Sequence, residues 1–240
     1  KKRKPIKLLQ LIPESVGKGY QILTFIVDFT LYGVPHKRKR LITIGRRTGQ
    51  LKSKIESLKS APEWFDSGSK EGIVDIRKAI GHLVRTRKND VLHNLPKMNE
   101  KHIQWASHIP KNSGGSAHLN ACKNENCKYV DEFKIVTCTK CGMLLPRPHV
   151  VNNDGSIRAI KGYKTSYRRM LPNEPANTIT MNSGVASSDN KLHYSQNRVL
   201  TLREILVLTT VYDLPEKKGF EPFPWSGKYD FSKSMKHSDY

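Results

Sequence analysis

The chain has 240 residues and a large excess of positive charge, with 42 Lys and Arg against 21 Asp and Glu, which gives a net charge of +21. Such an excess points to a polyanionic partner, and nucleic acid is the first candidate. No stretch reaches the roughly 18 consecutive apolar residues of a membrane-spanning helix, and the basic N-terminus lacks the apolar core of a signal peptide. We therefore expect a soluble intracellular chain with one large or two small domains and no membrane partner.

The N-terminal part predicts two strands. The segments "GYQILTFIVDF" and "KRLITIGRR" are rich in Ile, Val, Leu and Phe, as strands are. The link "TLYGVPHKRK" carries a Gly and a Pro that are typical of a turn, and a short amphipathic segment, "IKLLQLI", precedes the first strand. We expect a strand pair at the edge of an α/β sheet, with the cations of residues 37–40 leading into its second strand.

The polar middle of the chain predicts two short helices. In "SKEGIVDIRKAIGHL", after possible caps at Ser67 and Ser69, apolar residues recur on one helix face. They are Ile73, Ile76, Ile80 and Leu83. The second helix is expected in "NEKHIQWASHI", and the segments between and after the two have loop compositions.

Four cysteines follow in the spacing C-x4-C-x10-C-x2-C, and they are Cys122, Cys127, Cys138 and Cys141. Zinc binds four soft ligands in a tetrahedron, and two facing turns that each carry a cysteine pair provide them without a large core. Two disulfides or chance pairs of free thiols are the alternatives, and the lack of a secretory signal favours zinc. Because four protein ligands fill the coordination sphere, such a zinc ion would be structural.

The clearest local signal lies near the C-terminus, in "TLREILVL". Thr201 and Glu204 form a capping box, in which each side chain can bond the backbone N–H of the other residue. An apolar run follows immediately, so we predict a helix that starts at Leu202.

Three segments resemble motifs of the DNA cytosine-5 methyltransferases, in the family's order. "GVPHKRKR", residues 33–40, resembles motif VIII, whose pattern is Gly-Val-Pro-Gln-x-Arg-x-Arg. "YRRMLPNEPANTIT", residues 167–180, resembles the end of the target recognition domain. "NRVLTLREILVL", residues 197–208, resembles motif IX, with Arg198, Thr201 and Glu204 at matching positions. Three ordered motifs are more specific than any one of them.

The resemblance implies roles in binding double-stranded DNA for the cations of motif VIII. Arg38 and Arg40 would approach the flipped target cytosine and its backbone, and His36 and Lys37 would lie at the same DNA surface. Cations at a rigid strand start hold a phosphate at small ordering cost. On composition alone, a solvated charge run that discourages pairing at the sheet edge explains them equally well.

The resemblance and the composition of the polar loops give roles to further residues. Arg168, Arg169 and Thr178 would face DNA, although paired arginines can also simply cap a loop. Arg158 and Lys161 stand in a polar loop whose side chains can bond base edges. By resemblance to motif IX, the scaffold of the recognition domain would include Arg198, Thr201 and Glu204.

The departures from the family are as informative. His36 stands where a Gln is usual, Thr209 likewise replaces a Gln, and the final Gly-Asn-Ala-Val-Pro motif does not occur. The chain has no Gly-rich loop for S-adenosylmethionine, no Pro-Cys nucleophile and no Glu-Asn-Val segment. Since the reaction needs a thiolate, an acid and a methyl donor, we expect no catalysis by this chain alone. It begins at Lys1, so a subunit, a processed product and a fragment are all open.

The expected fold is α/β, or α+β overall. Residues 1–47 would form terminal strands of a Rossmann-like, S-adenosylmethionine-dependent methyltransferase sheet. Residues 48–200 would form a small irregular target recognition domain that contains the zinc module of residues 122–141, and residues 201–240 the motif IX helix and a return segment.

We expect the DNA-recognition portion of a DNA cytosine-5 methyltransferase, with a catalytic subunit or N-terminal segment as its partner. The resemblance suggests a restriction-modification system acting on DNA in the bacterial cytoplasm. The alternatives are a stand-alone zinc-containing DNA-binding module and, less in keeping with the three motifs, a ribosomal or RNA-binding protein. Exposed apolar surface on the strand pair discriminates between the methyltransferase portion and the stand-alone module. Half a sheet is unstable without the strands that it normally joins, so a protein without a partner is not expected to expose it.

Overall fold

The computed structural model describes residues 20–47, 72–84 and 90–211. Contacts divide the chain into two compact units: the first comprises Lys1–Gly33 and Arg38–Ile73, and the second comprises Val34–Lys37 and Val74–Tyr240. Within the described ranges, no helix is long and apolar enough to cross a membrane. The segment "IKLLQLI" and the possible caps Ser67 and Ser69 lie outside the described residues.

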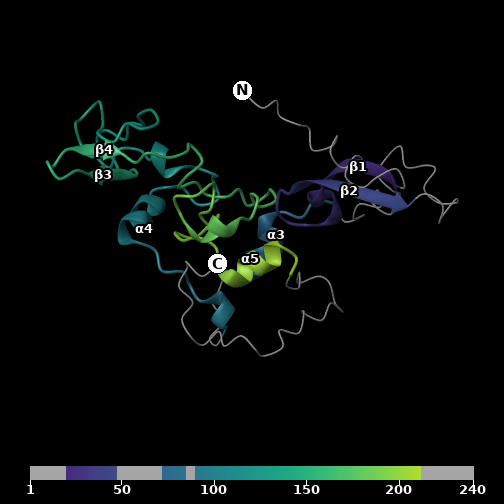
Figure 1. Ribbon diagram of the computed structural model, residues 1–240. Coiled ribbons are helices and arrows are strands. Elements are labelled where there is room, and N and C mark those ends of the chain that lie inside the picture. Colours follow the sequence, from purple (N-terminus) through teal and green to yellow (C-terminus); the bar gives the residue numbers. More distant parts are fainter. Residues whose placement is uncertain (1–19, 48–71, 85–89, 212–240) are drawn as a thin grey trace, which may run out of the picture. The chain divides into compact units, whose positions relative to one another are not determined.

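The first unit contains the predicted strand pair. Strands β1 (Tyr20–Asp28) and β2 (Lys39–Arg47) pair antiparallel and are joined through the 3-10 helix η1 (Phe29–Tyr32), as Figure 1 shows. Asp28 ends β1 and starts η1, because its carboxylate accepts hydrogen bonds from the Thr30 amide at 3.2 Å and the Thr30 hydroxyl at 2.7 Å. Gly33 ends η1 at φ 78°, in the left-handed region that favours glycine. The prediction of two strands around a turn is confirmed.

One face of this strand pair carries two large apolar side chains that are exposed. Ile26 and Leu41 are direct partners across the two strands, and they are 71% and 45% exposed. On the same face Thr24 and Thr43 are also paired, with their hydroxyl oxygens 3.2 Å apart. A two-stranded sheet is marginal in water by itself and needs further strands or a covering helix.

In the second unit, two helices from distant parts of the sequence pack together. Helix α3 (Ile76–Ile80), which continues into the 3-10 turn η2 (Gly81–Leu83), lies beside α5 (Leu202–Leu208), as Figure 1 shows. A short 3-10 turn, η3 (Val91–His93), contacts α5. Their buried core includes residues from both helices and from the segments between: Ile76, Ile80, Leu83, Met170, Tyr194, Leu200, Val207 and Leu208.

Both predicted helices of the middle region form, with one correction. Helix α3 begins at Ile76, because the Asp75 carboxylate accepts a hydrogen bond from the Lys78 amide at 2.7 Å and so caps the helix. Ile73, which we expected on the buried helix face, precedes the cap and is 59% exposed. Helix α4 (Glu100–Ser107) forms where predicted and is capped by Asn99.

A second core supports the remaining elements of the second unit. Trp105 and Ala106 of α4, Ala117 of the 3-10 turn η4 (Ala117–Leu119), and Tyr167 pack together in it. Strands β3 (His149–Val151) and β4 (Ile157–Ala159) form a short antiparallel hairpin. The 3-10 helix η5 (Met181–Gly184) follows residues 167–180, which we call the recognition-like segment. The described part of the chain is thus mixed helix and strand with two small sheets, in keeping with an α/β class.

Candidate functional site

The motif VIII loop, residues 34–37, is held by residues 174–179 of the second unit. The Pro35 carbonyl accepts from the Ala176 amide at 2.8 Å, and the Lys37 amide donates back to the Ala176 carbonyl at 2.7 Å. A parallel β-bridge joins His36 to Ala176. Two segments far apart in the sequence, each of which resembles a family motif, therefore form one continuous backbone arrangement, which we call the loop clasp.

Side chains reinforce the loop clasp. The Thr178 hydroxyl donates to the Lys37 carbonyl at 2.6 Å, and the Lys37 ammonium lies 2.5 Å from the Glu174 carboxylate. Both ends of that ion pair are about half exposed, so it contributes about 0–1 kcal/mol. His36 is buried, and its Nδ1 accepts a hydrogen bond from the Ile179 amide at 3.3 Å. His36 therefore faces the protein interior, whereas Lys37 lies at the surface.

A buried lysine also supports the loop clasp. Lys191 is 1% exposed, and its ammonium donates to the Thr178 carbonyl at 2.7 Å. Burial lowers the pKa of Lys191, and the charge of Asp189 opposes this effect. No sequence signal marks this role, because a single lysine in a polar loop is normally a surface residue.

The two consecutive arginines of the recognition-like segment have opposite environments. Arg168 is exposed, and its Nε donates to the Gly114 carbonyl at 2.7 Å. Arg169 is 2% exposed, and its guanidinium donates to backbone carbonyls and to the Asn197 side chain. The carbonyls belong to Ala106, Ile109, His193 and Gln196.

Arg169 therefore joins the end of α4 to residues 193–197. Burial lowers the pKa of its guanidinium to about 10, and the carbonyls that it binds include Ala106 in the last turn of α4, where the helix dipole favours a cation. A side chain with its donors engaged inside the protein does not reach a DNA backbone. We therefore assign Arg169 a structural role in place of the DNA-facing one that the resemblance implied, while Arg168 keeps the exposure that such a role requires.

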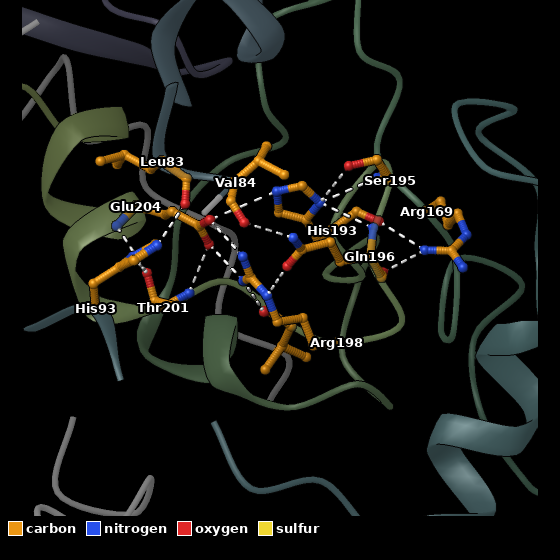
Figure 2. Close-up of polar contacts among 11 residues, drawn as sticks. Leu83, Val84, His93, Arg169, His193, Ser195, Gln196, Arg198, Thr201 and Glu204 are labelled. Atoms are coloured by element: carbon orange, nitrogen blue, oxygen red, sulfur yellow. Dashed lines mark hydrogen bonds and ion pairs between the residues drawn. The ribbon is translucent and has the colours of Figure 1, made fainter. Parts of the chain in front are cut away.

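The motif IX residues form a buried ion pair, drawn in Figure 2. Arg198 donates to both carboxylate oxygens of Glu204, each at 2.7 Å, and Glu204 is completely buried. The predicted capping box is present: the Thr201 amide donates to Glu204 at 2.8 Å, and the Glu204 amide donates to the Thr201 hydroxyl at 3.3 Å. Burial alone would raise the pKa of Glu204, but Arg198 outweighs it and holds the pKa below the ordinary value.

Two histidines extend this network to either side. His93 lies 2.8 Å from the Thr201 hydroxyl and, through Nε2, 2.5 Å from the Leu83 carbonyl, so it links the cap of α5 to η2 (Figure 2). His193 accepts hydrogen bonds at Nδ1 from the Ser195 and Gln196 amides, at 3.1 and 3.2 Å. Burial lowers the pKa of His193 to about 4, which keeps its ring neutral.

The four cysteines meet as the spacing predicted. Their sulfur atoms all lie within 4.8 Å of one another, and the Cys122–Cys141 and Cys127–Cys138 pairs are 3.5 and 3.7 Å apart. A zinc ion with four bonds of about 2.3 Å to sulfur in a tetrahedron requires sulfur atoms about 3.8 Å apart. The cysteines are free thiols, not disulfides. The cluster therefore has the composition and the spacing of a zinc site.

The charge balance of the cluster also fits a cation. The Met143 amide, and to a lesser degree the Cys122 thiol, lowers the pKa of Cys141 to about 7. The Asn124 amide also lowers the pKa of Cys122. Burial and the neighbouring thiols have a larger opposite effect and raise the pKa of Cys122 to about 12. Four thiolates so close together repel one another unless a cation lies between them.

The turns of this cysteine module are held by a buried arginine. Arg147 is 1% exposed and donates to the carbonyls of Asn120, Asp131, Glu132 and Ile135. Asp131 in turn accepts from the Thr139 hydroxyl at 2.5 Å, which ties the two halves of the module together. Sequence reasoning identified the cysteines but missed Arg147, because its carbonyl partners carry no sequence signature.

The remaining predicted DNA-binding residues are exposed, except for Arg38, which is partly buried. Arg158 is exposed in β4, and its Nε lies 3.2 Å from the Asn152 side-chain oxygen, across the hairpin. Lys161 follows the hairpin and is exposed. Arg40 is exposed in β2 of the first unit, and Arg38 directly before β2 is partly buried. The structure brings together His36, Lys37 and Thr178 in the loop clasp; Arg158 and Lys161 lie elsewhere on the second unit.

Comparison with known proteins identifies the class. A sequence model of the C-5 cytosine-specific DNA methylases matches residues 5–219, which is most of the chain. The chain therefore belongs to this family, whose members use S-adenosylmethionine.

A curated relative is the Type II methyltransferase M1.HgaI of Avibacterium volantium. The two are 28% identical over 222 residues, a match that covers 87% of this chain and 50% of the relative. The chain thus spans about half the length of the curated relative that it matches.

Proposed function

We propose that this chain is the C-terminal, DNA-recognition portion of a DNA cytosine-5 methyltransferase, which transfers a methyl group from S-adenosylmethionine to carbon 5 of a flipped cytosine in a specific duplex sequence. The observation that carries the proposal is the loop clasp, because it joins the motif VIII loop to the segment that resembles the end of the recognition domain. In this proposal residues 48–200 are the target recognition domain, and residues 1–47 and 201–240 complete the catalytic domain.

The clasp suggests how recognition and chemistry are linked. Lys37 is fixed by its backbone on both sides, through the Ala176 carbonyl and the Thr178 hydroxyl. Arg38 and Arg40 follow at the start of β2, where we assign them to the target cytosine and its flanking phosphates. Flipping a base costs a few kcal/mol, and cations held at a fixed place offset part of that cost without further ordering.

We assign His36 and Thr178 to positioning the motif VIII loop. Both use their polar atoms inside the clasp, on the Ile179 amide and the Lys37 carbonyl respectively. Lys37, Arg168, Arg158 and Lys161 are exposed cations and remain our candidates for contact with DNA.

Zinc would be held by Cys122, Cys127, Cys138 and Cys141 as a structural ion. Four protein ligands leave no open position for a reacting water molecule. Its binding energy would stabilise the cysteine module, whose small buried cluster in the described chain consists of Cys122, Cys138 and Leu145.

In this proposal the catalytic half comes from another segment or subunit. The sequence contains no Pro-Cys nucleophile and no Gly-rich loop that would bind S-adenosylmethionine, so we assign no residue of this chain to the cofactor. The exposed Ile26 and Leu41 on one face of β1 and β2 support this proposal, because further strands or helices of a catalytic domain would cover them. A bacterial restriction-modification system in the cytoplasm is the setting that we propose.

The test is transfer of a radiolabelled methyl group from S-adenosylmethionine to DNA, with the chain alone and with the protein that co-purifies with it from its source. Transfer by the mixture only is the expected result. If neither sample transfers label but the chain still binds one DNA sequence in a salt-sensitive way, the alternative of a stand-alone zinc-containing DNA-binding module is correct.

A further inference from the structure

Two lysines from separate segments lie on one aromatic ring next to the cysteine cluster. The ammonium groups of Lys134 and Lys164 are each 5.8 Å from the centroid of the Phe133 ring. Phe133 and Lys134 belong to the stretch between the two cysteine pairs, whereas Lys164 belongs to the segment after the β3–β4 hairpin. The two charges therefore lie no more than about 12 Å apart, next to the same aromatic ring.

The charges of the two lysines are not neutralised by an ion pair in the described part of the chain. Both lysines are exposed. Behind Phe133 lies His118, with ring centroids 4.9 Å apart, and burial together with the charges of Arg147 and Lys134 lowers the pKa of His118 to about 4. Asp131, a nearby carboxylate, is turned inward onto Thr139. No neutralising partner for the two ammonium groups comes from these neighbours.

The backbone at Lys134 is also unusual. Its φ is 73°, a conformation that costs a non-glycine residue of order 1 kcal/mol or more. A lysine therefore occupies a position where glycine would be easier to accommodate. The geometry fixes the start of this side chain beside the Phe133 ring.

We propose that Lys134 and Lys164 bind a phosphodiester group of the DNA backbone above Phe133. The site rests on the proposed function, since it presupposes that the chain binds DNA. It gives the cysteine module a direct part in binding in addition to its structural one, because the turns that carry the cysteines position Lys134. Each phosphate that the lysines neutralise releases counterions from the DNA.

The experiment measures the affinity of the zinc-loaded 240-residue chain for duplex DNA by fluorescence anisotropy at several salt concentrations. The variants are Lys134→Gln, Lys164→Gln and the double substitution. Lys140→Gln is the matched control, because Lys140 is an exposed lysine of the same module whose ammonium lies 4.7 Å from the Tyr129 ring. Zinc content and thermal unfolding confirm that each variant is folded.

The expected result is a shallower salt dependence for the Lys134 and Lys164 variants. The slope of log affinity against log salt should decrease by about 0.9 for each phosphate that the variant no longer neutralises, so that the defect at about 50 mM salt shrinks by about 3.5-fold at about 200 mM. The control should keep the wild-type slope. Wild-type slopes in both lysine variants, or an equal change in the control, would overturn the phosphate site alone. If the wild-type chain itself shows no salt-dependent binding, the proposed function fails with it.

Discussion

Replacement of Glu204 by Gln tests whether the motif IX ion pair holds the second unit together. The carboxylate accepts two hydrogen bonds from Arg198 and one from the Thr201 amide, all between 2.7 and 2.8 Å. A Gln side chain keeps one oxygen but places an NH₂ group opposite these donors. The Arg198 side chain, which is only 8% exposed, then loses its counter-charge.

The expected loss of folding stability in Glu204→Gln follows from the burial of the Arg198–Glu204 ion pair. Removing one partner of a buried ion pair costs about 3–5 kcal/mol, because the other charge stays buried without compensation. Since the same carboxylate also caps α5, which packs on α3, we place the expected loss in the upper half of this range. Urea unfolding of the zinc-loaded chain, followed by circular dichroism, measures it.

The control is the same substitution at Glu174, whose ion pair with Lys37 is about half exposed and should contribute about 0–1 kcal/mol. A loss below about 1 kcal/mol in Glu204→Gln, or equal losses in the two variants, would refute the assignment of motif IX as the scaffold. The double variant Arg198→Met with Glu204→Met removes both charges, and it should recover part of the lost stability.

Three further predictions concern other parts of the second unit. The pKa of His193 is lowered to about 4 in the folded chain, so the unfolded chain takes up a proton at a higher pH than the folded one. The free energy of unfolding should therefore fall by about 3 kcal/mol as the pH decreases from about 6.5 to about 4. Urea titrations at several pH values should show that this pH dependence is lost in His193→Asn, whose side chain does not titrate. Metal analysis should find one zinc per chain, and Cys138→Ser or a chelator should abolish it and lower the melting temperature; full stability without metal would contradict a structural ion. Arg169→Gln should destabilise the fold by roughly 2–4 kcal/mol, because it leaves several buried carbonyls without a donor. Arg168→Gln should leave the stability unchanged and weaken DNA binding. The opposite pattern would contradict the structural role of Arg169 and the DNA-facing role of Arg168.

Local signals in the sequence were the reliable ones. The capping box at Thr201 and Glu204, the helix after Asn99 and the cysteine spacing each depend on residues close together in the chain, and all three are present in the structure. The start of α3 was misplaced because Asp75 caps it, although Ile73 continues the apolar period. The spacing of apolar residues alone does not show where a helix begins.

Long-range roles were not accessible from the sequence. Arg169 and Arg147 bind carbonyl groups up to 63 and 27 residues away, and every residue has a carbonyl, so no residue type marks the partner. The family resemblance placed both arginines of the Arg168–Arg169 pair on DNA. In an extended segment consecutive side chains point to opposite sides, and only one of two neighbours is therefore expected at the surface.

The same alternation bears on how the motif VIII loop works. His36 is buried and Lys37 is exposed, so the loop presents one side chain inward to the recognition-like segment and the next one outward. The inward residue accepts from the Ile179 amide, and an acceptor at this position is what the backbone of residues 174–179 requires. Histidine satisfies it with one ring nitrogen, as the oxygen of a glutamine side chain would. His36 thus supplies the kind of acceptor that a glutamine side chain also offers, and we keep our proposed role for the arginines that follow it.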